Sequence, residues 1–468
     1  MNEHGAIHPG VNPARVVDDH PGLPKPRRWW AIAAISFGTA LLVLDGSIAN
    51  VALPTIARDL GVSEAAVTNV VTVYQLVLVM LLLPFSSLGD RLGHRRLYQA
   101  GQVIFMIASA ACYFADTFTI LLVLRGMQAV GAGMALSVSA ALLRQIYPAS
   151  RLGAGLGFNS VILASSAAMA PTLGGYIVGH LYWELIFVAA APLAVISLML
   201  GRFLPDNEPR KQPSNFINGA LSALTMLLLV GGIQLGTHEQ LPWGIAVFVL
   251  GVLALLLLIA RERRRDAPVF PVDLLAKPVI GLSILANFSS FISAGLLMLA
   301  LPFRLENGMG YAPQTVGLLL LPYPLTMLIV SPLAGWASDR IAATKLGVTG
   351  MVIAIIGLVL LSTMPEQPGA FGIAWRLSLT ALGFGLFFSP NSRLLIGRAP
   401  RNRAAAAGGL LSTSRLFGQT MAAVVLGIVL AGGLGLGPTP LYVCCALAVV
   451  AALASMARFS QRDNPANR

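Results

Sequence analysis

The sequence predicts an all-α polytopic membrane protein, and two observations lead to that fold class. Charged side chains make up only 11% of the 468 residues, whereas soluble globular proteins carry about 25%. Apolar residues reach 56%, and the mean hydropathy is +0.78. Runs of about 20 apolar residues, the length that crosses a bilayer, follow one another along most of the chain. A water-soluble fold is therefore excluded.

Reading the chain for such runs gives fourteen transmembrane helices. They cover residues 29–53, 66–88, 96–115, 118–142, 153–178, 184–203, 215–236, 242–261, 279–302, 314–336, 346–364, 371–394, 404–431 and 439–458. Lys and Arg concentrate in the segments on the N-terminal side, with Arg58, Arg304 and Arg376 as exceptions. Cytoplasmic loops carry the excess of basic residues, so we expect both termini in the cytoplasm and the chain in the plasma (inner) membrane. The net charge of +12 then fits loops that face anionic lipid, and we expect no nucleic-acid partner.

Two loops of similar sequence indicate an internal repeat. Residues 86–96 read SSLGDRLGHRR after the second predicted helix, and residues 335–345 read GWASDRIAATK after the tenth. Their Asp-Arg steps lie 249 residues apart, and Arg125 and Arg376, each early in its helix, lie 251 apart. Six helices with short loops need roughly 200 residues, so two helices are inserted between equivalent halves. A parallel repeat of two six-helix bundles is a transporter architecture.

The repeat defines the expected organisation of the chain. A disordered cytoplasmic tail precedes the first helix, and a second tail follows the last one. The predicted segments are the tail 1–28, an N-terminal six-helix bundle 29–205, two inserted helices 215–262, a C-terminal six-helix bundle 278–458 and the tail 459–468.

Four sequence patterns together point to one family. Besides the loop motif at 86–96, residues 44–54 read LDGSIANVALP, residues 125–133 read RGMQAVGAG and residues 166–175 read SAAMAPTLGG. In this order and on these helices they resemble the motifs of the major facilitator superfamily, specifically of its fourteen-helix drug:proton antiporter family. The resemblance implies two pseudo-symmetric bundles that export lipophilic compounds by alternating access. It also implies energy from a proton gradient, with no cofactor and no metal.

The two loop motifs supply a candidate conformational latch. A carboxylate beside basic residues at a helix end can pair with a neighbouring helix in one transport state and release it in another. The alternative is a basic loop that only sets topology. The candidate latch residues are Asp90, Arg91, Gly93, Arg95 and Arg96 in the first loop, and Asp339 and Arg340 in its repeat.

Asp45 is the candidate proton or cation site. It lies about nine residues, or roughly 13 Å, from Pro54 at the outer end of the first helix. Arg125 lies roughly 10 Å from the outer start of the fourth helix, and Gln128 belongs to the same motif. Helices one and four face each other in the resembled fold, so Arg125 is the expected electrostatic partner of Asp45. An isolated charge at this depth costs about 2.5 kcal/mol or more and is functional by default; a purely structural ion pair is the alternative.

Two later helices carry further candidates. Pro171 removes a backbone hydrogen bond from the fifth helix, and with Gly174 and Gly175 it resembles the antiporter hinge of the family. Glycines that only permit close packing are the alternative. Arg415 lies roughly 16 Å inside the thirteenth helix, where it either contacts substrate or caps backbone carbonyls.

Two acidic residues are predicted near the outer mouth. Glu184 and Glu306 stand where the family has other residues, and either of them is a candidate for drawing in or releasing cations. A charge on a solvated rim is the alternative reading of both.

Three functions follow from the sequence. The first is a proton-coupled exporter of lipophilic drugs or toxic compounds, a monomer whose partners are substrate, protons and membrane lipid. The second is an exporter of one metabolite, such as a siderophore, peptide or sugar derivative, on the same scaffold. The third, a membrane enzyme or receptor without transport, finds no support because the chain contains no P-loop, zinc-protease or serine-elbow motif.

Overall fold

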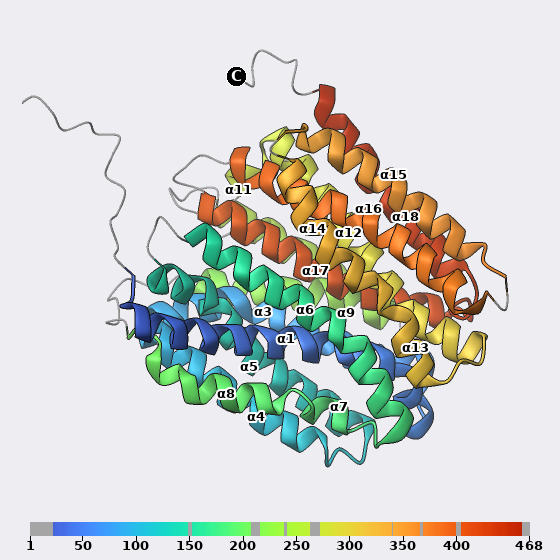
Figure 1. Cartoon of the computed structure of the whole chain (residues 1–468), viewed down its shortest axis with the longest axis horizontal. Helices are drawn as coiled ribbons and strands as arrows, with labels where there is room; N and C mark the ends of the chain where they lie inside the picture. Colours follow the sequence, from blue (N-terminus) through green and yellow to red (C-terminus); the bar gives the residue numbers. More distant parts are fainter. Residues whose placement is uncertain are drawn as a thin grey trace, which may run out of the picture.

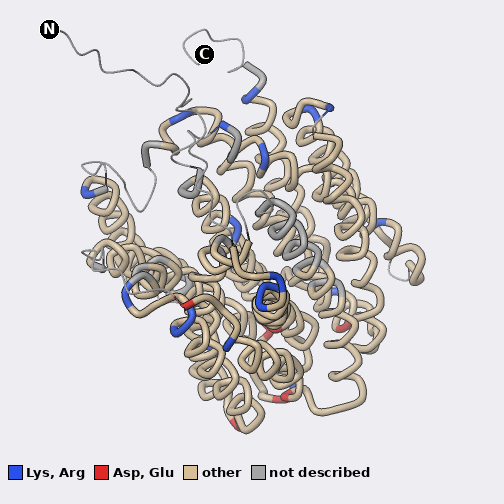
Figure 2. The backbone as a smooth tube through the Cα atoms, turned by 60° about the vertical axis from the view of Figure 1, so that its left-hand side comes forward, with Lys and Arg blue, Asp and Glu red and all other residues tan. Residues whose placement is uncertain are grey.

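The part of the chain that the structure describes consists of helices joined by short connections, as the sequence predicts. The structure is a computed structural model and describes residues 22–147, 152–206, 216–237, 241–262, 272–338, 340–365, 368–398 and 404–460. Among these residues, 11 helical segments are long and apolar enough to cross a membrane. Figure 2 shows long stretches of helix without a charged residue. The chain is therefore an integral membrane protein.

The first group of helices forms one bundle. Its elements are α1 (Lys25–Asp59), α2 (Glu64–Val67), α3 (Asn69–Leu92), α4 (His94–Cys112), α5 (Phe118–Ile146), α6 (Leu152–His180), α7 (Leu185–Val188), α8 (Ala191–Leu200) and the 3-10 turn η3 (Gly201–Phe203). α1 packs against α6 and α8, while α5 packs against α3 and α4. Figure 1 shows α1, α4, α5 and α8 grouped on one side of the molecule.

The last group forms a second bundle of the same plan. Its elements are α11 (Val272–Leu275), α12 (Pro278–Phe303), the π-helical turn η4 (Arg304–Gly308), α13 (Pro313–Leu320), α14 (Pro322–Ala337), α15 (Ala343–Ser362), α16 (Gly369–Arg398), α17 (Ala404–Ala431) and α18 (Thr439–Ser460). α16 packs against α14 and α15 as α5 packs against α3 and α4. This correspondence confirms the pseudo-symmetric repeat that the two loop motifs predict.

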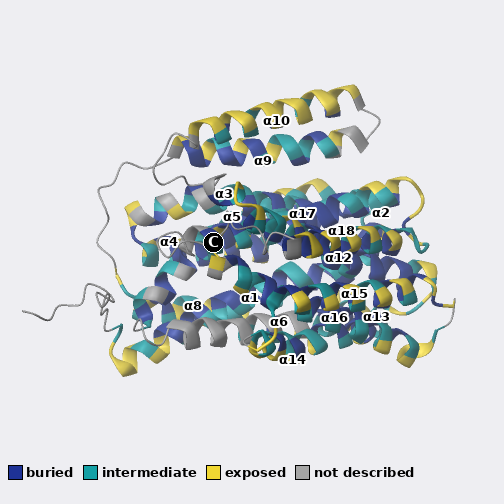
Figure 3. Ribbon diagram, turned by 90° about the horizontal axis from the view of Figure 1, so that it is seen from above, coloured by how far each residue is buried: buried dark blue, intermediate teal, exposed yellow. Residues whose placement is uncertain are grey.

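The two inserted helices lie outside both bundles. They are α9 (Phe216–Thr237) and α10 (Leu241–Glu262), which pack against each other and form a separate layer in Figure 3. α9 also packs against α3 of the first bundle and α17 of the second. A Cβ atom added at Gly219 of α9 would lie 3.3 Å from Cα of Pro84 in α3, so the two backbones are close. The pair therefore lies along the line where α3 and α17 meet.

Proline breaks two of the predicted spans. The sixth span consists of α7, α8 and η3, and the tenth consists of α13 and α14. Pro192 and Pro322 occupy the first turns of α8 and α14, where a residue without an N–H is tolerated and begins a new helix. The pieces continue in one direction, so each still forms one membrane-spanning segment.

The first helix begins and the last helix ends on the same side of the molecule. Each of the fourteen predicted spans falls on a helix or broken helix in the described residues, and successive spans run in opposite directions. We call the side where α1 begins and α18 ends the terminal side, and the other the opposite side. α1 begins at Lys25, inside the predicted tail 1–28, and α18 continues to Ser460. Residues 1–21 and 461–468 lie outside the described residues.

Candidate transport site

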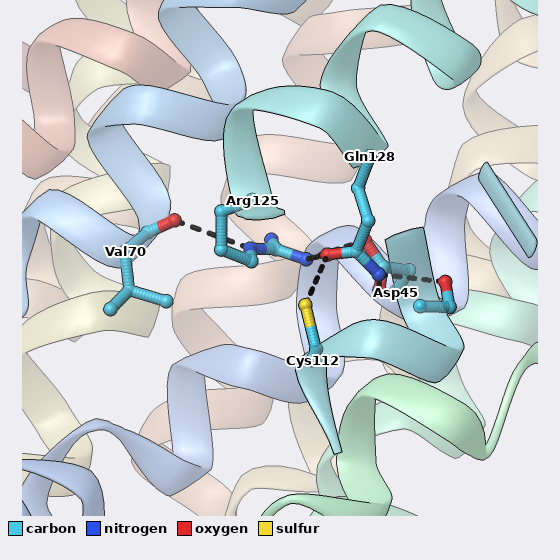
Figure 4. Close-up of polar contacts among 6 residues, drawn as sticks. Asp45, Val70, Cys112, Arg125 and Gln128 are labelled. Atoms are coloured by element: carbon cyan, nitrogen blue, oxygen red, sulfur yellow. Dashed lines mark hydrogen bonds and ion pairs between the residues drawn. The ribbon is translucent and has the colours of Figure 1, made fainter. Parts of the chain in front are cut away.

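The centre of the first bundle contains a buried ion pair. Nη1 of Arg125 donates a hydrogen bond to Oδ2 of Asp45 over 2.9 Å, as Figure 4 shows. The side chain of Asp45 is 0% exposed and that of Arg125 is 1% exposed. α1 and α5, the first and fourth spans, bring these two residues together across 80 positions of sequence. The predicted pairing of Asp45 with Arg125 is confirmed.

Gln128 joins the pair into a network. It lies three residues after Arg125, and therefore on the same face of α5. Its Oε1 accepts a hydrogen bond from Nη1 of Arg125 over 2.8 Å, and its Nε2 donates to Oγ of Ser109 over 2.7 Å. Nε2 also lies 3.5 Å from Oδ1 of Asp45. Gln128 thus holds both the cation and the carboxylate in one orientation.

Aromatic rings and a backbone carbonyl complete the surroundings of Arg125. Its guanidinium carbon lies 4.2 Å from the ring centroid of Tyr74 and 5.1 Å from that of Phe187. Its Nε donates to the carbonyl of Val70 over 3.4 Å (Figure 4). Sequence reading missed Tyr74, Phe187 and Ser109, because they come from α3, α7 and α4 and no motif marks them.

The network can bind a proton only after a structural change. The carboxylate of Asp45 is a proton acceptor, and the donors of Arg125 and Gln128 stabilise its charged form. Because it is fully buried, water reaches it only when the helices around it move apart. Such a group fits a carrier that exposes one site alternately to two sides.

Arg415 of α17 lies in the interior of the second bundle, as predicted. It is half-buried, and no residue that the structure describes forms a hydrogen bond or ion pair with it. Of the two readings that the sequence leaves open, a cap on backbone carbonyls is not seen among the described residues.

Glu306 differs from the predicted solvated rim charge. Its residue is 6% exposed, and it accepts hydrogen bonds from Arg58 and Thr55 of α1. Asn307, its neighbour in η4, donates to Glu64 of α2. These contacts join the two bundles on the opposite side, so the rim reading is wrong for Glu306. Glu184, the other candidate, is half-buried and precedes α7.

Arg304 is buried as well and is not the loop residue that the charge pattern suggested. Its guanidinium donates to the carbonyls of Leu361 and Ser362 over 3.1 and 3.4 Å. These carbonyls end α15, where backbone acceptors have no partner within the helix. Arg304 therefore caps α15 and explains how a buried cation is tolerated there.

The first loop motif forms a tight turn between two helices. Gly93 has φ of 93°, a left-handed conformation that favours glycine, and it both ends α3 and precedes α4. Arg91 and Arg96 are exposed, and Nη1 of Arg95 lies 3.7 Å from Oδ2 of Asp206. The side chain of Asp90 lies outside the described residues, so the latch stays a prediction.

The second loop motif is described only in part. Asp339 lies outside the described residues. The guanidinium carbon of Arg340 lies 3.9 Å from the ring centroid of Trp336, at the end of α14. A cation is attracted to the face of an aromatic ring, and this contact holds Arg340 beside the end of α14.

The glycine pair of the antiporter motif contacts two different helices. α6 continues through Pro171, with Gly174 and Gly175 one turn later. A Cβ at Gly174 would lie 3.0 Å from Ile48 of α1, whereas a Cβ at Gly175 would lie 2.9 Å from Cα of Gly317 in α13. Gly175 and Gly317 thus let α6 of the first bundle touch α13 of the second. The hinge role remains a prediction, and close packing between the bundles is what the structure shows.

The sequence profile of the Major Facilitator Superfamily matches residues 35–261 and 283–468. The chain belongs to this superfamily. Among its relatives is "Uncharacterized transporter YebQ" of Escherichia coli (strain K12), which is 40% identical over 446 residues, 94% of this chain and 97% of the relative. The riboflavin transporter RibZ of Clostridioides difficile (strain 630) is 28% identical, covering 83% and 85% of the two chains. The multidrug efflux pump LfrA of Mycolicibacterium smegmatis is also 28% identical, covering 86% and 81%.

Solved structures of transporters share the fold of this major facilitator protein. A D-xylose-proton symporter aligns with a TM-score of 0.67 at 14% identity, covering 91% of this chain and 97% of that one. A bacterial homologue of the human lysosomal transporter Spinster aligns with a TM-score of 0.68 at 16% identity, covering 95% and 100%. The family and its structural neighbours are transporters, so the chain is a transporter and not an enzyme.

Proposed function

We propose that this protein is a proton-coupled antiporter that exports lipophilic drugs or toxic compounds by alternating access. It acts as a monomer in the plasma membrane, with its terminal side in the cytoplasm, and the proton gradient drives it without a cofactor. The buried pair of Asp45 and Arg125 carries this proposal, because an ionisable pair deep in a span marks a proton or substrate pathway.

The proposed cycle uses the charge of Asp45. A proton on Asp45 removes that charge and weakens its hydrogen bonds to Arg125 and Gln128. Arg125 keeps the carbonyl of Val70 and the ring of Tyr74, so it is not left without partners. Substrate and proton then compete for one arrangement of this network, and this competition couples substrate movement to proton movement.

The arrangement of contacts between the bundles supports alternating access. Two contacts join the bundles on the opposite side: Glu306 with Arg58, and Gly175 with Gly317. On the terminal side, the contact of Arg95 with Asp206 remains within one bundle. A molecule with this distribution of contacts is closed on the opposite side, and these contacts must separate in the other state of the cycle.

Reconstitution tests the coupling. Purified protein in liposomes that contain a trapped pH-sensitive dye is given lipophilic compounds, and substrate-dependent proton movement is measured. The wild-type chain is expected to move protons when substrate is added. Asp45→Asn keeps the shape of the side chain but removes the proton acceptor, so it is expected to insert and fold yet lose this signal.

Asp116→Asn is the matched control, because it makes the same chemical change at an exposed carboxylate between α4 and α5. It is expected to move protons as the wild type does. Wild-type proton movement by the Asp45→Asn variant would exclude Asp45 as the coupling group, and Glu306 and Glu184 would be tested next.

Export of a single metabolite is the second candidate function. The relative named as a riboflavin transporter favours it, since that name gives one substrate on a chain of similar length. A susceptibility panel of dyes, biocides and antibiotics on a pump-deficient host separates the two functions. Resistance to several unrelated compounds supports drug export, while unchanged susceptibility with a metabolite accumulating outside the cells supports the alternative.

A further inference from the structure

Arg415 is a cation in the interior of the protein without a described partner. At 1.5 Å per residue it lies roughly 16 Å from the start of α17. The other buried arginines are satisfied: Arg125 by Asp45, Arg304 by the carbonyls that end α15, and Arg458 by Asn391. Arg415 is half-buried, and no described residue hydrogen-bonds to it. An intramembrane charge without a protein partner points to a partner that comes and goes.

The position of Arg415 around α17 places it near the side that packs on α12. Gly418 faces α12, because a Cβ there would lie 2.9 Å from Cβ of Phe291. Ile428, on another side of the helix, is 41% exposed. At about 100° per residue, Arg415 lies roughly 60° from Gly418 and roughly 140° from Ile428. It therefore lies next to the contact with α12.

Towards the terminal side, the face of α17 that carries Arg415 is only partly covered by described residues. Gly408, Ser412, Arg415 and Gln419 are spaced by four, three and four residues, which places them on one side of the helix. Each of them is half-buried or exposed, and nothing lies within 4 Å of a Cβ added at Gly408. This polar stripe leads from Gln419 towards the terminal side, where α17 begins.

Aromatic side chains of α12 and α16 lie beside Gly418, which is three residues from Arg415 in α17. Phe291 of α12, beside Gly418, stacks on Phe388 of α16 with ring centroids 4.2 Å apart and an interplanar angle of 19°. Phe388 also stacks on Phe384, with centroids 5.7 Å apart. Stacked flat rings offer a surface on which a planar apolar group can pack.

The charges of the described interior disfavour a cation at this place. Asp45, the described carboxylate at mid-helix depth, is fully buried and bound by Arg125. Glu306 is bound by Arg58 on the opposite side. A cationic compound beside Arg415 would meet repulsion from the guanidinium, whereas the guanidinium matches a carboxylate, phosphate or sulfonate in two parallel hydrogen bonds.

We propose that Arg415 anchors a binding site for organic anions with a planar apolar body. The anionic group binds the guanidinium, Ser412 and Gln419 face it from the same side of α17, and the planar body packs on the rings of Phe291 and Phe388. This inference names the substrate class of the proposed transporter and depends on that function for its role in transport, but binding itself can be measured without a gradient.

Equilibrium binding to the purified full-length protein tests the site. Carboxyfluorescein is the anionic planar probe, ethidium is the cationic planar probe, and fluorescence anisotropy reports binding of each. The wild type is expected to bind carboxyfluorescein more tightly. Arg415→Gln is expected to weaken that binding by about tenfold or more, the loss of a charge-assisted hydrogen bond, while Arg415→Lys retains part of it.

A second variant keeps Arg415 in place. Gln419→Glu puts a carboxylate one turn away on the same face, where it can neutralise the guanidinium. It is expected to weaken carboxyfluorescein binding and to leave or improve ethidium binding, which a purely structural role of Arg415 does not predict. Arg398→Gln, a change of the same kind at the exposed end of α16, is the control and is expected to bind both probes as the wild type does.

Two outcomes would overturn the inference. One is tighter binding of ethidium than of carboxyfluorescein to the wild type. The other is wild-type carboxyfluorescein binding by both Arg415→Gln and Gln419→Glu. If Arg415-dependent binding is found while proteoliposomes show no proton coupling, the proposed antiport is refuted and the anion site stands.

Discussion

At the scale of single residues, Arg125 does more than pair with Asp45. It donates to Asp45 and Gln128, lies against two aromatic rings and is among the largest fully buried side chains of the protein. Taking a guanidinium and a carboxylate out of water costs several kcal/mol each, and only close contacts of this kind offset that cost. The charged carboxylate of Asp45 therefore requires the cation beside it.

Removing the cation alone is predicted to destabilise the protein more than removing both charges. Arg125→Met leaves the buried Asp45 without its cation and is expected to cost about 3–5 kcal/mol, seen as a lower midpoint of thermal unfolding in detergent. The double variant with Asp45→Asn is expected to recover much of that midpoint without recovering transport. A double variant less stable than Arg125→Met alone would contradict the account of an unpaired buried charge.

At the scale of helices, α6 and α13 approach each other through glycine. A Cβ atom at Gly317 would lie 2.4 Å from the carbonyl oxygen of Pro171 and 3.0 Å from Cα of Gly175. These are backbone atoms, which cannot turn away as a flexible side chain does. The contact between the bundles at this point therefore requires that neither residue carries a side chain.

Gly317→Ala is predicted to separate α6 from α13. The expected cost is about 1–3 kcal/mol of overpacking in the state described here. A cysteine at Gln314, which lies against Gly179 in the same contact, is then expected to react faster with a maleimide in a variant lacking the native cysteines. Gly231→Ala on α9 is the matched control, because a Cβ there meets nothing within 4 Å. Equal reactivity in both variants would contradict the close contact.

At the scale of the whole molecule, side chains join the bundles on the opposite side. Arg58 and Thr55 of α1 bind Glu306, and Glu64 of α2 binds Asn307. These residues lie about 250 positions apart in sequence, one group in each half of the repeat. The inserted helix α9 packs on α3 and α17, and so also touches both bundles. Opening of the opposite side must break the first set of contacts.

Glu306→Gln is predicted to favour the state that is open on the opposite side. It removes the charge that Arg58 binds, and because Arg58 is 59% exposed the effect is expected to be modest. About 1 kcal/mol corresponds to roughly a fivefold change in the equilibrium between two states. Tyr182 and Ala312 are both exposed and belong to different bundles. With a spin label at each position, the change appears as a larger population of molecules in which the two labels are far apart. Asp116→Asn is expected to leave the distances unchanged, and a shift of equal size there would point to net charge as the cause.

The sequence by itself determined the membrane class, the spans and the repeat. Apolar runs of bilayer length identify helices whatever their neighbours are, because in lipid every backbone polar group must be satisfied within the segment. The span predicted at 404–431 coincides with α17 (Ala404–Ala431). The depth of Asp45 and Arg125 could be counted along each helix, and the resembled family fold implies that these two helices face each other, which is why their pairing was predictable.

What only the tertiary structure decided is which side chains meet across helices. Tyr74 and Phe187 around Arg125, Arg304 at the end of α15, and Glu306 against Arg58 come from elements far apart in sequence. Their partners depend on the rotation of each helix about its axis, which packing against neighbours sets and which composition alone does not record. For the same reason the sequence leaves Glu306 between a cation-handling group and a solvated rim charge, while the fold buries it between two bundles, where a charge requires the partner that α1 supplies.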